Sequence, residues 1–176
     1  MKIPHQDAMA QDSRSDYAEP AAAAQSSGTS IMVQIDGTPQ QMDLEDYVAG
    51  VVAAEVPPTF PPEALKAQAV AARTYAAYKL ASGRPEAHRE ADVCDDYHHC
   101  AAYIDLAAEA SGRWGNGAET YQNAILEAVR STAGEVVLYE DKPIIAVFSA
   151  AAAEKTESSA DVWGNDVPYL QAVDSP

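Results

Sequence analysis

Glu55 is the residue best suited to act as a general acid, because it ends an apolar segment that begins at Leu44. The apolar spacing predicts a helix with Asp43 as its N-cap, which Pro57 and Pro58 stop shortly after Glu55. The C-terminal end of a helix carries partial negative charge, and apolar neighbours reduce contact with water. Both effects favour the protonated carboxyl group that a general acid needs. The residues alone leave open the alternative that Glu55 is an ordinary solvated residue at a helix end.

Two cations on the next predicted helix could hold a substrate beside this acid. The helix follows Pro61-Pro62 and runs to about Ser82. Lys66 and Arg73 are seven residues apart, so they project from nearly the same face and could bind an anionic or polar group. The alternative is that both are ordinary surface cations, with Lys66 paired to Glu63 three residues earlier.

A group of histidines and cysteines forms a second candidate site. His88, Cys94, His98, His99 and Cys100 fall within thirteen positions. Two thiolates and two imidazoles are a tetrahedral ligand set for zinc, and four protein ligands are typical of a structural site. We predict that His88, Cys94, His99 and Cys100 bind zinc, which would hold an irregular loop beside the cleft and contribute folding energy. A Cys94–Cys100 disulfide is the main alternative, and two free thiols are another.

The elements that must position these residues predict an α+β fold. The dipeptide Asp36-Gly37 follows a strand-like segment and signals a hairpin. Residues 84–105 are predicted to be irregular. Further elements are a return strand near residues 40–42, a helix over 118–132 and a second hairpin formed by 135–139 and 143–148. The prediction is a single domain in which helices pack on small antiparallel hairpins and a loop carries the metal site.

Composition excludes one large class of partner. The chain of 176 residues has 11 Lys and Arg against 27 Asp and Glu, a net charge of −16. Nucleic-acid binding requires a basic surface, so we expect no nucleic acid partner. Residues 1–28 are polar and alanine-rich and are predicted to be a disordered lead or linker before a domain at 29–176. No apolar run reaches the roughly 18 residues of a membrane helix, and we expect the domain to be truncated at its C-terminus.

Two blocks of sequence resemble a known family of bacterial cell-wall proteins. The first runs from Leu44 to Glu55 (LEDYVAGVVAAE) and from Glu63 to Tyr75 (EALKAQAVAARTY). The second runs from Thr156 to Gly164 (TESSADVWG), followed by VPYL at 167–170 and VDSP at 173–176. Together they resemble the SpoIID/LytB family of sporulation and wall proteins of Gram-positive bacteria. The resemblance covers most of the chain from about residue 30.

The resemblance implies a lytic transglycosylase that cleaves peptidoglycan glycan strands between N-acetylmuramic acid and N-acetylglucosamine, with Glu55 as the single catalytic acid and base. It implies a role in spore engulfment or wall remodelling, outside the cytoplasm, attached to the wall or membrane in the native protein. An amidase and membrane proteins of an engulfment complex are further candidate partners. Some members of the family carry a zinc site with the spacing found here. Substrate contacts are expected from Lys66, Gln68, Arg73, Tyr75, Ser149, Thr156 and Glu157.

One stretch departs from the family pattern. Where members often have Ser, Thr and Gly before the Thr-Glu pair, this chain has alanine at Ala150–Ala153. Fewer hydrogen bonds to sugar would follow, which keeps open a non-catalytic role as an amidase enhancer or wall-binding protein. A zinc-stabilised structural module is a third hypothesis, but it leaves the segment around Glu55 unexplained.

Overall fold

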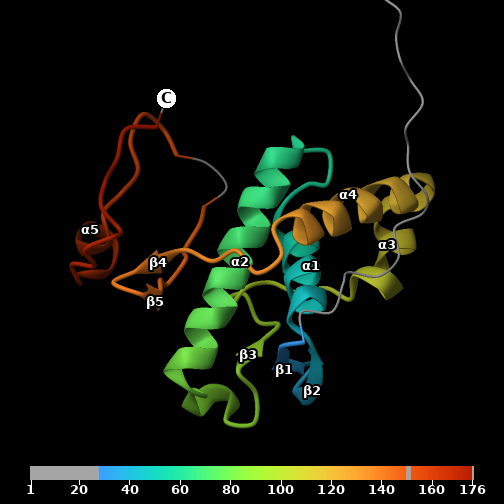
Figure 1. The fold of residues 1–176 in the computed structure, drawn as a ribbon, viewed down its shortest axis with the longest axis horizontal. Helices are drawn as coiled ribbons and strands as arrows, with labels where there is room; N and C mark the ends of the chain where they lie inside the picture. Colours follow the sequence, from blue (N-terminus) through green and yellow to red (C-terminus); the bar gives the residue numbers. More distant parts are fainter. Residues whose placement is uncertain (1–27, 150–151, 176) are drawn as a thin grey trace, which may run out of the picture.

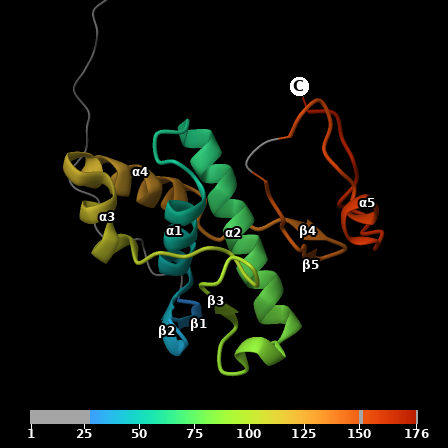
Figure 2. The same cartoon turned by 180° about the vertical axis from the view of Figure 1, so that it is seen from behind.

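The structure is a computed structural model that describes residues 28–149 and 152–175. The long helix α2 (Pro62–Ser82) runs through its middle, with α1 (Leu44–Glu55), α3 (Leu106–Trp114) and α4 (Ala118–Ser131) on one side (Figures 1 and 2). The C-terminal part lies on the other side. Helices combined with two small sheets make the fold α+β, as predicted. The predicted disordered lead falls outside the described residues except for Gly28. None of the described helices has the length and apolarity to cross a bilayer.

The N-terminal hairpin forms at the predicted place. Strands β1 (Ser30–Ile35) and β2 (Thr38–Asp43) pair antiparallel. The turn residues Asp36 and Gly37 both have positive φ, +48° and +78°, as a two-residue turn of this kind requires. A third strand, β3 (Val93–Cys94), pairs parallel to β1 and was not predicted. It is only two residues long, so its pattern carries no strand signal, yet it places Cys94 against the core.

Helix α1 begins and ends where the sequence predicts. The carboxylate of Asp43 accepts a hydrogen bond from the amide of Glu45 and caps the helix. Most side chains of α1 are buried, including Tyr47, because the helix packs against β1, β2, α2, α3 and α4. Helix α1 is therefore the centre of the hydrophobic core, and Glu55 extends from its C-terminal end.

The other elements differ from the prediction mainly in length. Helix α2 ends at Ser82 with Gly83 as its C-cap, as predicted, and α4 matches its predicted range to within one residue. Helix α3, capped by Asp105, was not predicted. The second hairpin exists but is reduced to β4 (Leu138–Tyr139) and β5 (Lys142–Pro143). Within the predicted first strand, the amide of Val137 donates to the hydroxyl of Thr74 on α2, while its carbonyl oxygen accepts from the amide of Ile144. The short elements η1 (Glu86–His88), η2 (Gly115–Gly117) and α5 (Ser159–Trp163) complete the chain.

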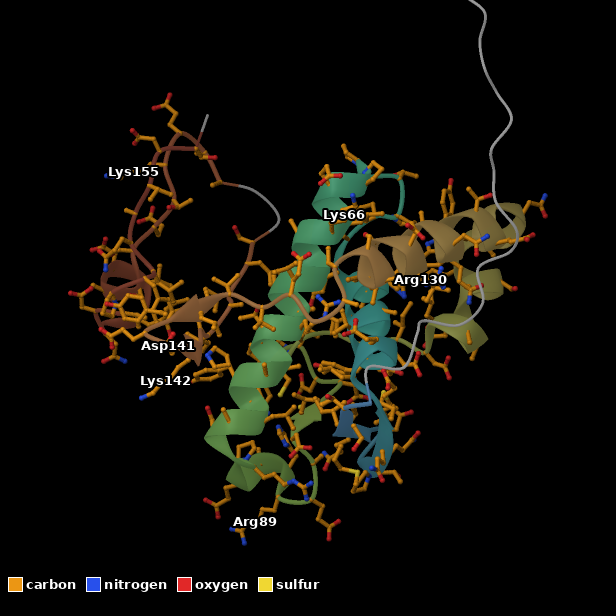
Figure 3. The ribbon with its side chains drawn as sticks, viewed as in Figure 1. Lys66, Arg89, Arg130, Asp141, Lys142 and Lys155 are labelled. Atoms are coloured by element: carbon orange, nitrogen blue, oxygen red, sulfur yellow. The ribbon has the colours of Figure 1, made fainter. Side chains whose placement is uncertain are left out.

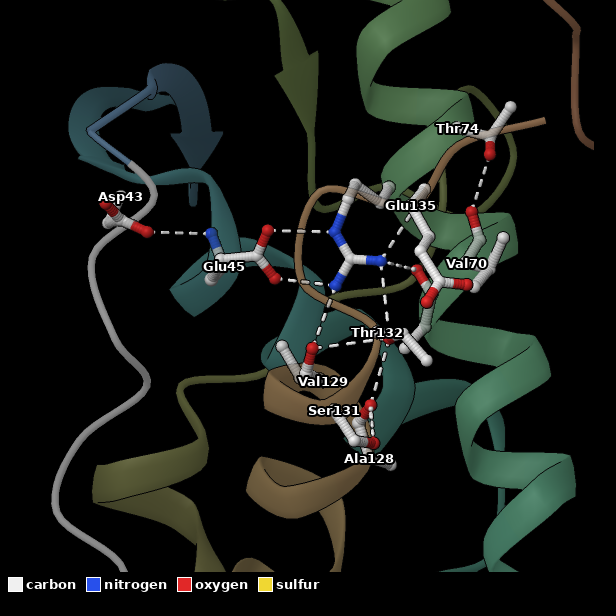
Figure 4. A network of polar contacts seen from close by, with 11 residues as sticks. Asp43, Glu45, Val70, Thr74, Ala128, Val129, Ser131, Thr132 and Glu135 are labelled. Carbon is white, nitrogen blue, oxygen red and sulfur yellow. Dashed lines mark hydrogen bonds and ion pairs between the residues drawn. The ribbon is translucent and has the colours of Figure 1, made fainter. Parts of the chain in front are cut away.

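A buried ion pair joins the main helices. The guanidinium of Arg73 on α2 donates to both carboxylate oxygens of Glu45 on α1, at 2.8 Å and 2.6 Å. It also donates to the carbonyl oxygen of Val129 and to Thr132 and Glu135, at the end of α4 and just beyond it (Figure 4). The two side chains are 1% and 2% exposed. Arg73 lies on the buried face of α2. Its neighbours on that face, Ala69, Ala72 and Ala76, are small, so the long arginine side chain fits between α2 and the helices α1 and α4.

This position corrects the expectation that Arg73 contacts substrate. A side chain that is 1% exposed and makes six hydrogen bonds to other residues cannot reach a ligand without breaking the core. The expectation followed from the spacing of Lys66 and Arg73, which predicts a shared helix face but not which part of that face is covered. Arg73 is a structural residue.

We predict that Glu45→Ala lowers the free energy of unfolding by about 3–5 kcal/mol, because it leaves the Arg73 charge buried without its partner. Urea unfolding followed by circular dichroism measures the change. Glu86→Ala is the matched control, since it removes a glutamate from the ion pair with Arg89, in which both side chains are exposed. We expect the control to unfold like the wild type. Equal midpoints for Glu45→Ala and the wild type would contradict a structural role for the pair.

Candidate functional site

In the described part of the chain, one oxygen of the Glu55 carboxyl group accepts a hydrogen bond and the other does not. The residue is half-buried at the end of α1, and its Oε1 accepts a hydrogen bond of 3.0 Å from the amide of Ala102. Its Oε2 has no hydrogen-bond partner within residues 28–149 and 152–175. One oxygen thus sets the orientation of the group, and the other is free to exchange a proton with a ligand.

A glycine allows the Ala102 segment to reach α1. The amide of Ile104 donates to the carbonyl oxygen of Gly50 at 3.4 Å, five residues before Glu55 on the same helix. A Cβ atom on Gly50 would clash with the ring of Tyr103 and would lie 2.5 Å from the carbonyl oxygen of Ile104. The Tyr103 ring stacks on Tyr47 of α1, with centroids 5.8 Å apart. A glycine inside an apolar helix signals a close backbone approach, so Gly50 is a packing position beside the site that the sequence analysis did not identify.

The four predicted metal ligands lie together. One potential ligand atom from each of His88, Cys94, His99 and Cys100 lies within 4.8 Å of the others. The Sγ of Cys94 is 3.5 Å from Nδ1 of His99, and the Sγ of Cys100 is 3.4 Å from Nε2 of His88. A tetrahedral zinc ion with ordinary bond lengths separates its sulfur and nitrogen ligands by about 3.6 Å. The donor set and its spacing therefore fit zinc.

The surroundings of this cluster also suit a cation. The Nδ1 of His88 lies 2.8 Å from the carbonyl oxygen of Ala91, which selects the tautomer that leaves Nε2 as a lone-pair donor. Both cysteines are free thiols in the structure. Burial raises the pKa of Cys94 to about 11, so the thiol is protonated at neutral pH unless a cation displaces the proton. His98, which is not one of the four predicted ligands, is exposed and packs against Tyr97.

The other predicted site residues of α2 take different positions. Lys66 lies near the start of α2 (Figure 3), where it forms an ion pair of 2.8 Å with Glu63 that raises its pKa. No ion pair joins it to Glu55 in the described part of the chain. Gln68 is 9% exposed, and its amide nitrogen has no partner among the described residues. Tyr75 is half-buried beside the cluster, and burial together with the Cys100 thiol raises its pKa.

The predicted contacts from the second block lie elsewhere. Ser149, Thr156 and Glu157 line a cavity of about 600 Å³ that also contains Phe148, Trp163 and Tyr169. Glu55 is not among its lining residues, and α2 separates this C-terminal part from α1 (Figures 1 and 2). The structure therefore does not bring these three residues to the acid. Of the alanine stretch, Ala152 and Ala153 line the cavity, while 150 and 151 fall outside the described residues.

Known proteins match the part of the chain that holds Glu55 and the cluster. The sequence model of the SpoIID family, described as stage II sporulation protein, matches residues 37–139. Stage II sporulation protein D of Bacillus subtilis (strain 168) is 39% identical over 137 residues, 78% of this chain and 40% of that protein. The protein of the same name from Bacillus amyloliquefaciens is 36% identical over 137 residues, with coverage of 78% and 40%.

A more distant relative carries a different name. The amidase enhancer of Bacillus subtilis (strain 168) is 32% identical over 123 residues, which cover 70% of this chain and 14% of that protein. This chain spans about 40% of the length of the two sporulation proteins that it matches. The family match contains Glu55 and all four residues of the cluster but ends before Thr156 and Glu157.

We predict that Gly50→Ala displaces residues 102–104 from α1 and lowers stability, because the added methyl group overlaps Tyr103 and Ile104. Hydrogen exchange measured by mass spectrometry should show lower protection of the segment around Ala102. Gly112→Ala is the matched control, since a Cβ atom there meets no atom within 4 Å and alanine favours the helix that contains it. Unchanged protection in Gly50→Ala would contradict the close approach.

Proposed function

The chain belongs to the SpoIID family, and from this membership we propose that it is a lytic transglycosylase that cleaves the glycan strands of peptidoglycan. The observation that carries the proposal is the Glu55 carboxyl group, whose Oε1 is fixed by the amide of Ala102 and whose Oε2 has no hydrogen bond among the described residues. Two relatives named stage II sporulation protein D support a setting in sporulation, at engulfment or in remodelling of the wall. Both settings place the protein outside the cytoplasm, at the wall or membrane.

A single carboxyl group is sufficient for this reaction. Protonated Glu55 donates its proton to the glycosidic oxygen, and the bond from that oxygen to C1 of N-acetylmuramic acid breaks. The resulting carboxylate then accepts the proton of the C6 hydroxyl of the same sugar, whose oxygen forms a new bond to C1. The products are a free hydroxyl on N-acetylglucosamine and a 1,6-anhydro ring, and Glu55 recovers its proton. No water is consumed, so the second carboxylate that glycoside hydrolases use is not required.

The geometry supports this use of Glu55 because one oxygen must stay in place through two proton transfers. The amide of Ala102 holds Oε1, and the backbone of residues 102–104 lies along α1. Positioning of this kind reduces the entropy that the reaction must lose in reaching its transition state. Lys66 remains a candidate contact for substrate because its side chain is partly exposed. Gln68 and Tyr75 are candidates for the same role.

We further propose that His88, Cys94, His99 and Cys100 hold a zinc ion. Four protein ligands leave no open coordination position, so the ion would supply folding energy and no Lewis-acid chemistry. Cys100 is two residues before Ala102. Fixing the cluster therefore also fixes the segment that donates to Glu55.

A non-catalytic role as an amidase enhancer is the second candidate function. It is favoured by the relative of that name and by the alanines at 152 and 153, which give the C-terminal cavity fewer polar groups. In that case an amidase is the partner, and Glu55 has no role in bond cleavage.

We predict that Glu55→Gln lowers the rate of glycan cleavage by about 10²–10⁴-fold, the usual contribution of a general acid. The substrate is purified glycan strands stripped of peptides, and mass spectrometry detects the 1,6-anhydro ends. Glu119→Gln is the control, because Glu119 is exposed at the start of α4. Absence of anhydro ends with the wild-type chain and zinc present would favour the amidase-enhancer role. A wild-type rate in Glu55→Gln would reject the assignment of the acid.

We predict that the chain binds zinc at a ratio of one to one and that Cys94→Ser lowers both the bound zinc and the thermal midpoint, because a structural site contributes folding energy. Elemental analysis and thermal unfolding measure the two effects. His98→Ala is the control, since His98 lies outside the cluster. Full retention of zinc in Cys94→Ser, or mass-spectrometric detection of a Cys94–Cys100 disulfide in the wild type, would reject this site.

A further inference from the structure

The cavity of the C-terminal part is surrounded by large apolar side chains that remain exposed. Its volume of about 600 Å³ is in the usual range of ligand-binding pockets. Two of these side chains, Val162 and Trp163 on α5, are 53% and 56% exposed. The large apolar residues of the lining are Val147, Phe148, Val162, Trp163, Tyr169 and Leu170. Apolar side chains that gather around one exposed cavity indicate a binding surface.

Hydroxyl groups of the lining are used to hold the walls of the cavity together. The hydroxyl of Thr156 donates to the carbonyl oxygen of Val173 and accepts from its amide. The hydroxyl of Ser158 donates to the carboxylate of Asp161 and accepts from its amide. A sugar presents several hydroxyl groups that need partners once they are buried. The cavity therefore suits an apolar side chain better than a sugar.

The charge around the cavity is negative. Four exposed carboxylates belong to lining residues, bond to them or directly precede them in the chain: Glu154, Glu157, Asp161 and Asp166. Among the lining residues that the structure describes, Lys155 is the only cation (Figure 3). Coulomb repulsion therefore disfavours anionic ligands, including the carboxylate of N-acetylmuramic acid, and attraction favours cationic ones.

We propose that this cavity is a docking site for a partner protein, whose bound segment inserts a large apolar side chain flanked by lysine or arginine. Burial of the apolar side chain contributes most of the affinity, and the acidic rim orients the segment and speeds its association. The cavity lies across α2 from α1 and Glu55 (Figures 1 and 2). Docking there goes beyond the proposed cleavage of glycan and depends neither on Glu55 nor on the metal site.

Binding of short peptides to the ¹⁵N-labelled chain, followed by NMR, tests this proposal. The probe peptide has one phenylalanine between two pairs of lysines. One comparison peptide has alanine at the centre, and another has glutamates in place of the lysines. We expect the probe to bind at least about 10-fold more tightly than either, because it alone combines apolar burial with positive charge.

The two tryptophans of the chain report where the peptide binds. Trp163 lines the cavity, whereas Trp114 packs on Tyr121 at the end of α3. We expect the probe peptide to shift the indole signal of Trp163 and to leave that of Trp114 unchanged. A Trp163→Phe chain assigns the two signals.

Removing the exposed indole should weaken binding of the probe peptide. We expect a loss of about 30-fold in Trp163→Ala, the usual effect of truncating an anchor residue at an interface. Phe60→Ala is the matched control, because Phe60 is an exposed aromatic residue outside the cavity. Circular dichroism checks that both variants fold.

Removing charge tests the rim separately. Glu154→Gln combined with Glu157→Gln should weaken binding about threefold at low salt and less at high salt, because exposed charges are screened. Glu109→Gln combined with Glu119→Gln, on α3 and α4, is the control with the same change in net charge.

The site is rejected if Trp163→Ala and Phe60→Ala bind the probe peptide equally well, or if the peptide leaves the Trp163 signal in place. Lack of saturable binding, or equal binding of the glutamate peptide, would overturn the proposed chemistry of the partner. A glycan strand is the alternative occupant. If Trp163→Ala loses binding of purified glycan strands and not of the peptide, the cavity is a sugar-binding surface and the proposal is wrong. These outcomes are independent of cleavage at Glu55.

Discussion

The arrangement of the helices depends on the ion pair between Arg73 and Glu45. Removing two charges from water is costly, and here the cost is offset because both carboxylate oxygens are bonded and the guanidinium also bonds to groups at and beyond the end of α4. The pair allows only a narrow range of positions for α1, α2 and α4, since a shift of any helix would leave a buried charge unsatisfied. The ion pair also affects which side chains of α2 are exposed to solvent. Arg73 is buried in the core, whereas Lys66, seven residues earlier, remains partly exposed.

Helix α1, held in place by this ion pair, also makes a second set of contacts, which ends at Glu55. The backbone after Cys100 runs along α1 and passes close to Gly50. It thereby places the amide of Ala102 within hydrogen-bond distance of the Glu55 carboxyl group. A cation bound by the cluster would act on α1 through the segment that follows Cys100. In our proposal the metal site is thus a mechanical support for the acid, and chemistry at the metal is unnecessary.

The cavity of the C-terminal part is a second surface that a glycan substrate could contact, away from Glu55. It contains aromatic and polar side chains, as sugar-binding surfaces commonly do, but it lies across α2 from α1 and does not include Glu55. A glycan strand is a long polymer and can contact surfaces that are well separated. Binding in this cavity would therefore concern residues of the strand away from the bond that is cleaved. Its two alanines, Ala152 and Ala153, affect affinity in this view and leave the proton transfers at Glu55 unchanged.

The sequence by itself determined the elements whose signals are local: the Asp36-Gly37 hairpin, the limits of α1 and α2, the range of α4 and the composition of the His and Cys cluster. Spacing and capping are properties of neighbouring residues, so they can be read without a structure. Only the tertiary structure decided the positions that depend on distant groups. It placed Arg73 inside, paired β3 with β1, brought Ala102 to Glu55 and separated Thr156 and Glu157 from the acid. These positions follow from burial and packing between segments far apart in the chain, which helical spacing does not encode.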